Sequence, residues 1–97
     1  MYNATGSRNI GIGYSAGENA VSGTNNTSSK SVFIGTFTRP LADAQTNQIV
    51  IGDSTTGNGS NTVTIGNSSV TGNYFNGFLK QTSVTSALVK ASSTGLS

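Results

Sequence analysis

The chain has 97 residues, of which 33% are hydrophobic and 8% are charged, and it contains no Cys, His or Trp. A domain of this length normally buries one continuous apolar core, and few residues are available here to form one. Disordered chains combine low hydrophobicity with high charge, whereas this chain is polar and almost uncharged. The composition excludes disulfides and favours many short strands joined by turns of Gly, Asn, Ser and Thr.

The charge pattern argues against nucleic acid and membranes as partners. The net charge is +2, and the five basic residues are spread along the chain, so no stripe of positive charge could follow a phosphate backbone. The apolar runs are far shorter than the roughly twenty residues that cross a bilayer. We therefore expect neither nucleic-acid binding nor membrane insertion.

One short pattern recurs four times: a β-branched residue, any residue, Ile and Gly. Two residues that lie two apart in a strand point to the same side, and Gly permits a sharp turn with positive φ or a close approach of backbones. We predict a strand at each copy. The predicted rung residues are Ile10, Ile12, Gly13, Val32, Ile34, Gly35, Ile49, Ile51, Gly52, Val63, Ile65 and Gly66.

The spacing of the rung glycines predicts a repeat architecture with insertions. The intervals between them are 22, 17 and 14 residues. Single units are too small to bury their own apolar face, but units stacked about 4.8 Å apart align their Ile and Val side chains in columns. The predicted fold is all-β, with short parallel β-roll or β-solenoid rungs in residues 1–72 and a C-terminal cap, strand or linker in residues 73–97.

A column of amides accompanies two of the repeats. Asn47 and Asn61 stand five residues before the rung glycine, where Arg8 and Lys30 stand in the first two units. Stacked Asn side chains can hydrogen-bond along a column, and we expect this pair to do so.

The strand alternation leads to an expectation about the subunit interface. If the first and third residues of each repeat face the interior, then the middle residues, which include Phe33 and Val50, face outward. Exposed apolar patches usually mark contacts with another chain, so Phe33 and Val50 are the proposed subunit interface. The alternative is that Phe33 packs under its own chain, near Pro40 and Leu41.

The segment Tyr74–Leu79 is apolar and differs from the repeats. Its Asn76-Gly77 dipeptide favours a hairpin with a type I′ turn, because both residues accept positive φ. A cap over the last repeat, or a strand exchanged between subunits, would use the same residues. For residues 80–97, an extended strand and a flexible tail are both open.

The segments Lys30–Gly35, Asn47–Gly52 and Asn61–Gly66 resemble the Asn-Ser-Val-Ala-Ile-Gly repeats of trimeric autotransporter adhesin heads and related repeats of phage tail fibres. The interval from Gly52 to Gly66 matches the family's ideal repeat, and the earlier intervals are longer. The resemblance implies a left-handed parallel β-roll in each subunit and three rolls packed about a common axis.

The function implied by the resemblance is structural. We expect a segment of an extracellular homotrimeric fibre, such as a virion tail fibre, that serves as a stiff spacer and contacts other fibre or virion proteins. The loops Ser22–Ser31 and Thr36–Thr46 are candidates for contact with a host cell-surface glycan or protein. The alternative is the head of a bacterial trimeric adhesin at the cell surface.

Catalysis is not expected from these residues. Without His, the commonest general base is missing, and the carboxylates Glu18, Asp43 and Asp53 show no pairing. We predict no catalytic residues, cofactor or metal site, and no enzyme. Two less favoured alternatives are a fragment of a polysaccharide depolymerase and an ice-binding solenoid, whose Thr-x-Thr units at 36–38 and 62–64 stand in different registers.

Overall fold

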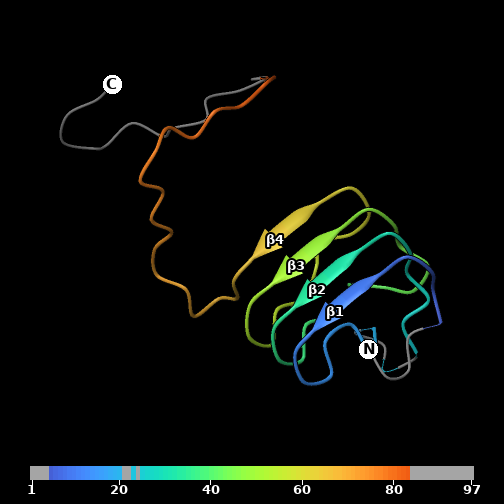
Figure 1. The fold of residues 1–97 in the computed structure, drawn as a ribbon. Helices are drawn as coiled ribbons and strands as arrows, with labels where there is room; N and C mark the ends of the chain where they lie inside the picture. Colours follow the sequence, from blue (N-terminus) through green and yellow to red (C-terminus); the bar gives the residue numbers. More distant parts are fainter. Residues whose placement is uncertain (1–4, 21–22, 24, 84–97) are drawn as a thin grey trace.

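The computed structural model describes residues 5–20, 23 and 25–83, and in this part of the chain the fold is all-β with no helix. Its four strands are β1 (Ile10–Ile12), β2 (Val32–Ile34), β3 (Ile49–Ile51) and β4 (Val63–Ile65). They form one parallel sheet in the order β1-β2-β3-β4, so neighbours in sequence are neighbours in space (Figure 1). The four copies of the repeat are the four strands, as predicted.

The strands pair without any slip in register, although the connections between them differ in length. Equivalent residues of the repeat therefore form three columns across the sheet. The first column is Ile10, Val32, Ile49 and Val63, the middle column is Gly11, Phe33, Val50 and Thr64, and the third is Ile12, Ile34, Ile51 and Ile65.

Backbone hydrogen bonds between successive turns of the chain continue beyond the strands. The Gly35 amide donates to the carbonyl of Ile12 at 2.7 Å, and the Gly66 amide donates to that of Ile51 at 2.7 Å. Two parallel bridges within the connections join Ser29 to Thr46 and Arg39 to Thr56. Each turn of the backbone thus pairs with the next through backbone hydrogen bonds.

Left-handed backbone conformations turn the chain on both sides of the strands. Five residues before each rung glycine, Arg8, Lys30, Asn47 and Asn61 have φ values of 61°, 55°, 56° and 63°. The rung glycines themselves all have positive φ, and they lie against one another: a Cβ on Gly13 would be 2.8 Å from the backbone of Gly35. Both roles predicted for these glycines, the turn and the close approach, are confirmed.

The interior of the turns is small and partly polar. Among the described residues, the buried hydrophobic side chains are Ala16, Ala20, Phe33 and Val50, and the buried polar ones are Asn26, Ser28, Ser31, Thr38, Gln48 and Thr55. Several of these polar groups bond to the backbone around them, as when the Asn26 amide donates to the carbonyl of Gly17 at 2.8 Å. Burial of polar groups is tolerated where such partners are present.

The expectation that Phe33 and Val50 face outward is wrong. Both side chains are 0% exposed, and they form the apolar cluster of the interior together with Ala16. A three-residue strand points two side chains to one face and one to the other, and the narrow interior accommodates the single middle side chain. The alternative, in which Phe33 packs under its own chain, describes the structure better: Pro40 is also buried, although Leu41 is 50% exposed.

The predicted hairpin at Tyr74–Leu79 is also wrong. Asn76 and Gly77 form a bend with no positive φ, and no strand flanks them. A two-stranded hairpin without a third strand or a packing partner is only marginally stable, which explains its absence. Tyr74 and Phe78 are 94% and 95% exposed, so they do not seal the last turn within the chain. Residues 84–97, with most of the expected tail, lie outside the described residues.

Replacement of Gly35 by Ala tests the stacking of the glycines. The new Cβ would collide with the carbonyl oxygen of Gly52, and φ at this position is 121°. We expect Gly35→Ala to lower the free energy of unfolding by more than about 2 kcal/mol. Gly77→Ala is the matched control, because nothing lies within 4 Å of its Cβ position. Equal thermal midpoints for the two variants in circular dichroism would contradict the arrangement.

Candidate functional site

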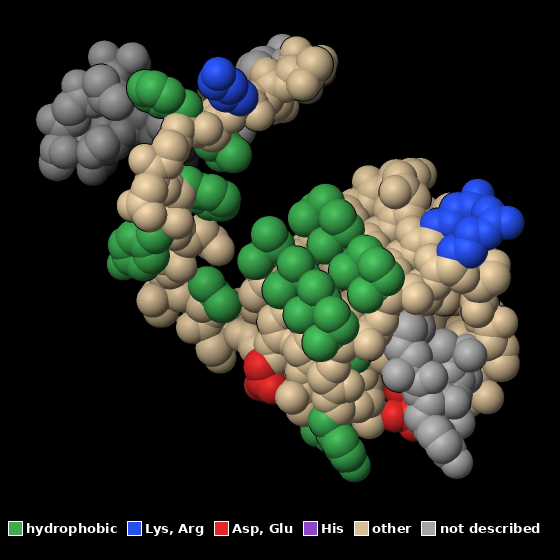
Figure 2. All heavy atoms as spheres, viewed as in Figure 1, with side chains coloured by type: hydrophobic (Ala, Val, Ile, Leu, Met, Phe, Trp, Pro, Cys, Tyr) green, Lys and Arg blue, Asp and Glu red, His purple; other side chains and the backbone are tan. Residues whose placement is uncertain are grey.

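The outward face of the sheet carries two columns of β-branched side chains. This surface, here named the outer sheet face, consists of Ile10, Ile12, Val32, Ile34, Ile49, Ile51, Val63 and Ile65. Ile12, Val63 and Ile65 are 59%, 63% and 55% exposed. Figure 2 shows hydrophobic side chains gathered in one patch over the strands. Contiguous apolar patches of this kind usually mark a contact with another molecule.

The candidate contact surface is therefore formed by the first and third columns of the sheet and not by the middle column. Phe33 and Val50, the proposed subunit interface, are enclosed by their own chain and present no surface to a partner. The rung Ile and Val residues, predicted to fill the interior, lie on the outside instead. Sequence reasoning missed this surface because alternation shows which residues share a face without showing which face is inside.

The expected amide column is present at the corner before β3 and β4. The Asn47 side-chain amide donates to the Asn61 side-chain oxygen at 2.8 Å. Asn is among the few residues with a side chain that readily adopts left-handed φ, so both residues suit this corner of the backbone as well as the hydrogen bond. Arg8 and Lys30 hold the same corner in the first two turns, where they are exposed.

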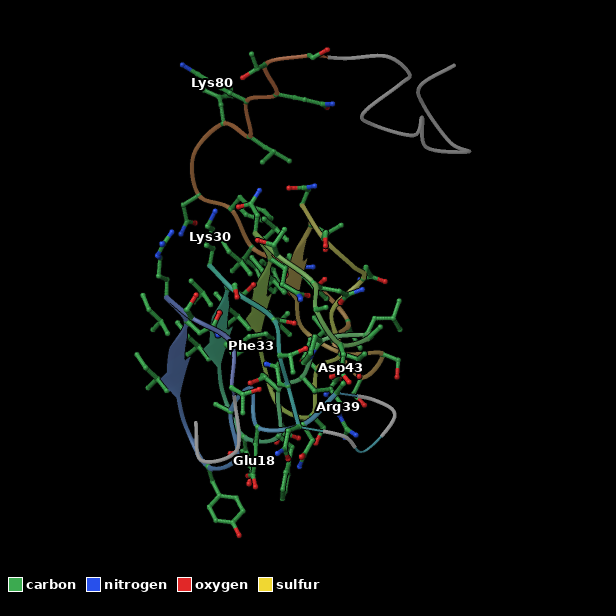
Figure 3. All side chains as sticks on the ribbon, turned by 90° about the vertical axis from the view of Figure 1, so that its right-hand side faces the viewer. Glu18, Lys30, Phe33, Arg39, Asp43 and Lys80 are labelled. Carbon is green, nitrogen blue, oxygen red and sulfur yellow. The ribbon has the colours of Figure 1, made fainter. Side chains whose placement is uncertain are left out.

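The acidic residues lie in separate connections. Glu18 follows β1, Asp43 lies between β2 and β3, and Asp53 follows β3; Figure 3 shows Glu18 and Asp43 at different heights of the molecule. Within residues 5–20, 23 and 25–83 no cluster of three or more His, Cys, Asp or Glu side chains could hold a metal ion. The same residues include no helix that could span a bilayer.

The Thr-x-Thr units do not form one flat array. Thr38 is buried, and its hydroxyl donates to the carbonyl of Gly35 at 3.2 Å. Thr64 stands in the middle column beside Val50. The two units therefore occupy different registers, as expected from the sequence.

The two loops predicted to contact a glycan differ in what they present. In the loop 22–31, Ser22 and Thr24 lie outside the described residues, while Asn26 and Ser28 are buried. The loop 36–46 presents exposed apolar side chains at Phe37 and Leu41.

Comparisons of the chain with protein-family models, with curated proteins and with solved structures found no match. Function must therefore be inferred from the surfaces described above and from the chemistry of their residues. Among them, the outer sheet face consists entirely of Ile and Val side chains.

Two substitutions at Asn61 separate the hydrogen bond from the backbone conformation. Asn61→Val loses the bond to Asn47 and places a β-branched residue at φ 63°, so we expect a loss of stability of about 2 to 3 kcal/mol. Asn61→Gly loses only the bond, for which about 1 kcal/mol is expected. Urea unfolding measures both values. Equal losses for the two variants would show that the left-handed corner is unimportant.

Proposed function

We propose that this chain is a structural segment of an extracellular homotrimeric fibre, in which the outer sheet faces of three copies pack together about a common axis. The observation that carries this proposal is the exposure of the Ile and Val columns, together with the small number of buried apolar side chains in the part of the chain that the structure describes. We interpret the stacked turns as rungs of a β-solenoid, and the fibre as a tail fibre of a virion.

A second copy of the chain is the occupant that best fits the outer sheet face. All eight side chains of this face are Ile or Val, so it offers neither hydrogen bonds nor charges to a polar partner. Its columns run across all four strands along the stacking direction. Under rotational symmetry the same residues of each copy meet at the axis, and the apolar columns would then be buried along the whole length of the stack.

The size of the face argues that further residues contribute to the interface. Strands of three residues, with a rise of about 3.3 Å and a spacing of about 4.8 Å, cover a face of only roughly 10 Å by 19 Å. A stable interface buries roughly 800 Å² per partner. The exposed segment 73–79 supplies additional apolar surface, since Tyr74, Phe75, Phe78 and Leu79 are all exposed. We propose that this segment packs against a neighbouring copy.

The backbone arrangement supports the proposed mechanical role. Each turn is fastened to the next by backbone hydrogen bonds that do not depend on side-chain identity. Three such stacks packed side by side resist bending because no turn can tilt without breaking bonds in its own stack and contacts in the others. The resemblance to fibre and adhesin-head repeats supports this role as a stiff spacer.

The assembly can be tested through its mass. Native mass spectrometry is expected to give about three times the chain mass of 9.8 kDa. Ile12→Lys should shift the distribution to monomers, because three ammonium groups would meet near the axis. Leu41→Lys is the matched control, since Leu41 is similarly exposed but lies off the outer sheet face. A folded wild-type monomer or dimer would reject the homotrimer.

The contribution of segment 73–79 has its own test. We expect Tyr74→Ser combined with Phe78→Ser to raise the concentration at which the trimer dissociates by at least about tenfold, since the variant lacks two aromatic side chains that the proposed interface buries. Light scattering over a dilution series measures this concentration. If the double variant dissociates at the same concentration as the wild type, the segment makes no contact with a neighbouring copy.

A further inference from the structure

A shallow pocket opens between the connections that follow β1 and β2. Its volume is about 160 Å³, and it is lined by Ser15, Glu18, Asn19, Phe37, Thr38 and Arg39. Figure 3 shows Glu18 and Arg39 at the same end of the molecule, opposite to Lys30 and Lys80. The pocket does not include any residue of the outer sheet face, so assembly through that face leaves its lining residues unused.

An exposed aromatic pair borders this pocket. The rings of Tyr14 and Phe37 meet edge to face, with centroids 5.5 Å apart and an interplanar angle of 89°. Tyr14 is 72% exposed and Phe37 is 46% exposed. The edge-to-face contact favours this arrangement of the two rings, and the pair leaves aromatic surface available to a ligand.

The backbone at Phe37 gives a second reason to regard this position as functional. Its φ is 54°, and the neighbouring turns adopt the same left-handed corner at Ser15 and Ser54. The left-handed conformation at this position is therefore common to three turns. A bulky aromatic residue adopts it at a cost in free energy, and the other two turns carry Ser at this position. Strain of this kind is concentrated at functional sites.

The longer connections of the chain build the pocket. Glu18 and Asn19 belong to the connection that spans the longest glycine interval, and Arg39 belongs to the second longest. The third connection has the shortest interval and places Asp53 and Ser54 after its glycine, without an aromatic residue. The insertions and the aromatic residues therefore occur together.

We propose that this pocket binds one ring of a neutral carbohydrate, which makes it the host-contact site of the fibre proposed above. The C–H face of a pyranose suits an aromatic surface, and its hydroxyls need donors and acceptors side by side. Arg39 and Asn19 supply N–H donors, and the Glu18 carboxylate and the Ser15 hydroxyl supply acceptors. The lining includes one carboxylate and one guanidinium, whose opposite charges balance, and this favours an uncharged ligand. The volume is below the roughly 300 Å³ of pockets for drug-sized ligands, which suits a single ring.

Saturation-transfer difference NMR on the full chain tests the proposal. The ligands are the methyl pyranosides of glucose, galactose, mannose and N-acetylglucosamine, with methyl glucuronide as the charged comparison. We expect saturation transfer to at least one neutral sugar, and a loss of affinity of at least about tenfold in Phe37→Ser. Phe37→Ser installs the residue that neighbouring turns carry at this corner, so the fold should persist. Leu41→Ser, a change of another exposed apolar residue in the same connection, should leave binding unchanged.

The outcomes separate this site from the proposed assembly. No transfer to any neutral sugar, preferential binding of methyl glucuronide, or undiminished binding by Phe37→Ser would each overturn the carbohydrate site. None of these results changes the mass of the assembly, which native mass spectrometry reports. If the protein is a monomer that still binds a neutral sugar, the proposed homotrimeric fibre is wrong and the proposed carbohydrate site stands.

Discussion

Backbone hydrogen bonding from one turn of the chain to the next is the interaction on which this structure depends. The interior holds few apolar side chains, with Phe33 and Val50 the large ones, so hydrophobic burial within one copy contributes little. The bonds require that successive turns approach closely and keep the same path. Glycines at the ends of the strands permit the approach, and left-handed corners before and after the strands fix the path. Side chains are then free to vary wherever they point away from the backbone ladder.

The same constraint explains which sequence predictions succeeded. The Ile-Gly repeats located all four strands, because a short strand and its following glycine are set by local chemistry. The Asn47–Asn61 hydrogen bond was also predictable, because both residues stand five positions before a rung glycine and therefore occupy the same corner of successive turns. Which face of the strands points to the interior was not predictable in this way. The usual assumption that the majority of apolar residues lie inside fails when the interior admits only one side chain per strand.

The wrong hairpin prediction and the missed pocket both depend on contacts that a sequence pattern does not reveal. Asn76-Gly77 has the chemistry of a tight turn, but a hairpin needs a surface on which to pack, and within residues 5–20, 23 and 25–83 Tyr74 and Phe78 are almost fully exposed. The pocket beside Tyr14 and Phe37 was missed because its residues come from two insertions that align only after the strands have paired. One signal was present in the sequence: both aromatic residues closely follow a rung glycine, and only in the two longer units.

The unequal connections have a consequence for how such a molecule can diversify. Every connection leaves and rejoins the stack at corners of the same geometry, so its length is not constrained by the register of the strands. Residues can be gained or lost in the connections while the strands keep the same backbone hydrogen bonds. Under the proposed function, ligand recognition and stiffness depend on different residues of the chain, and a change of ligand would not require a change in the paired strands. The connections of such a molecule can therefore diversify in length and sequence while the pairing of the strands stays constant.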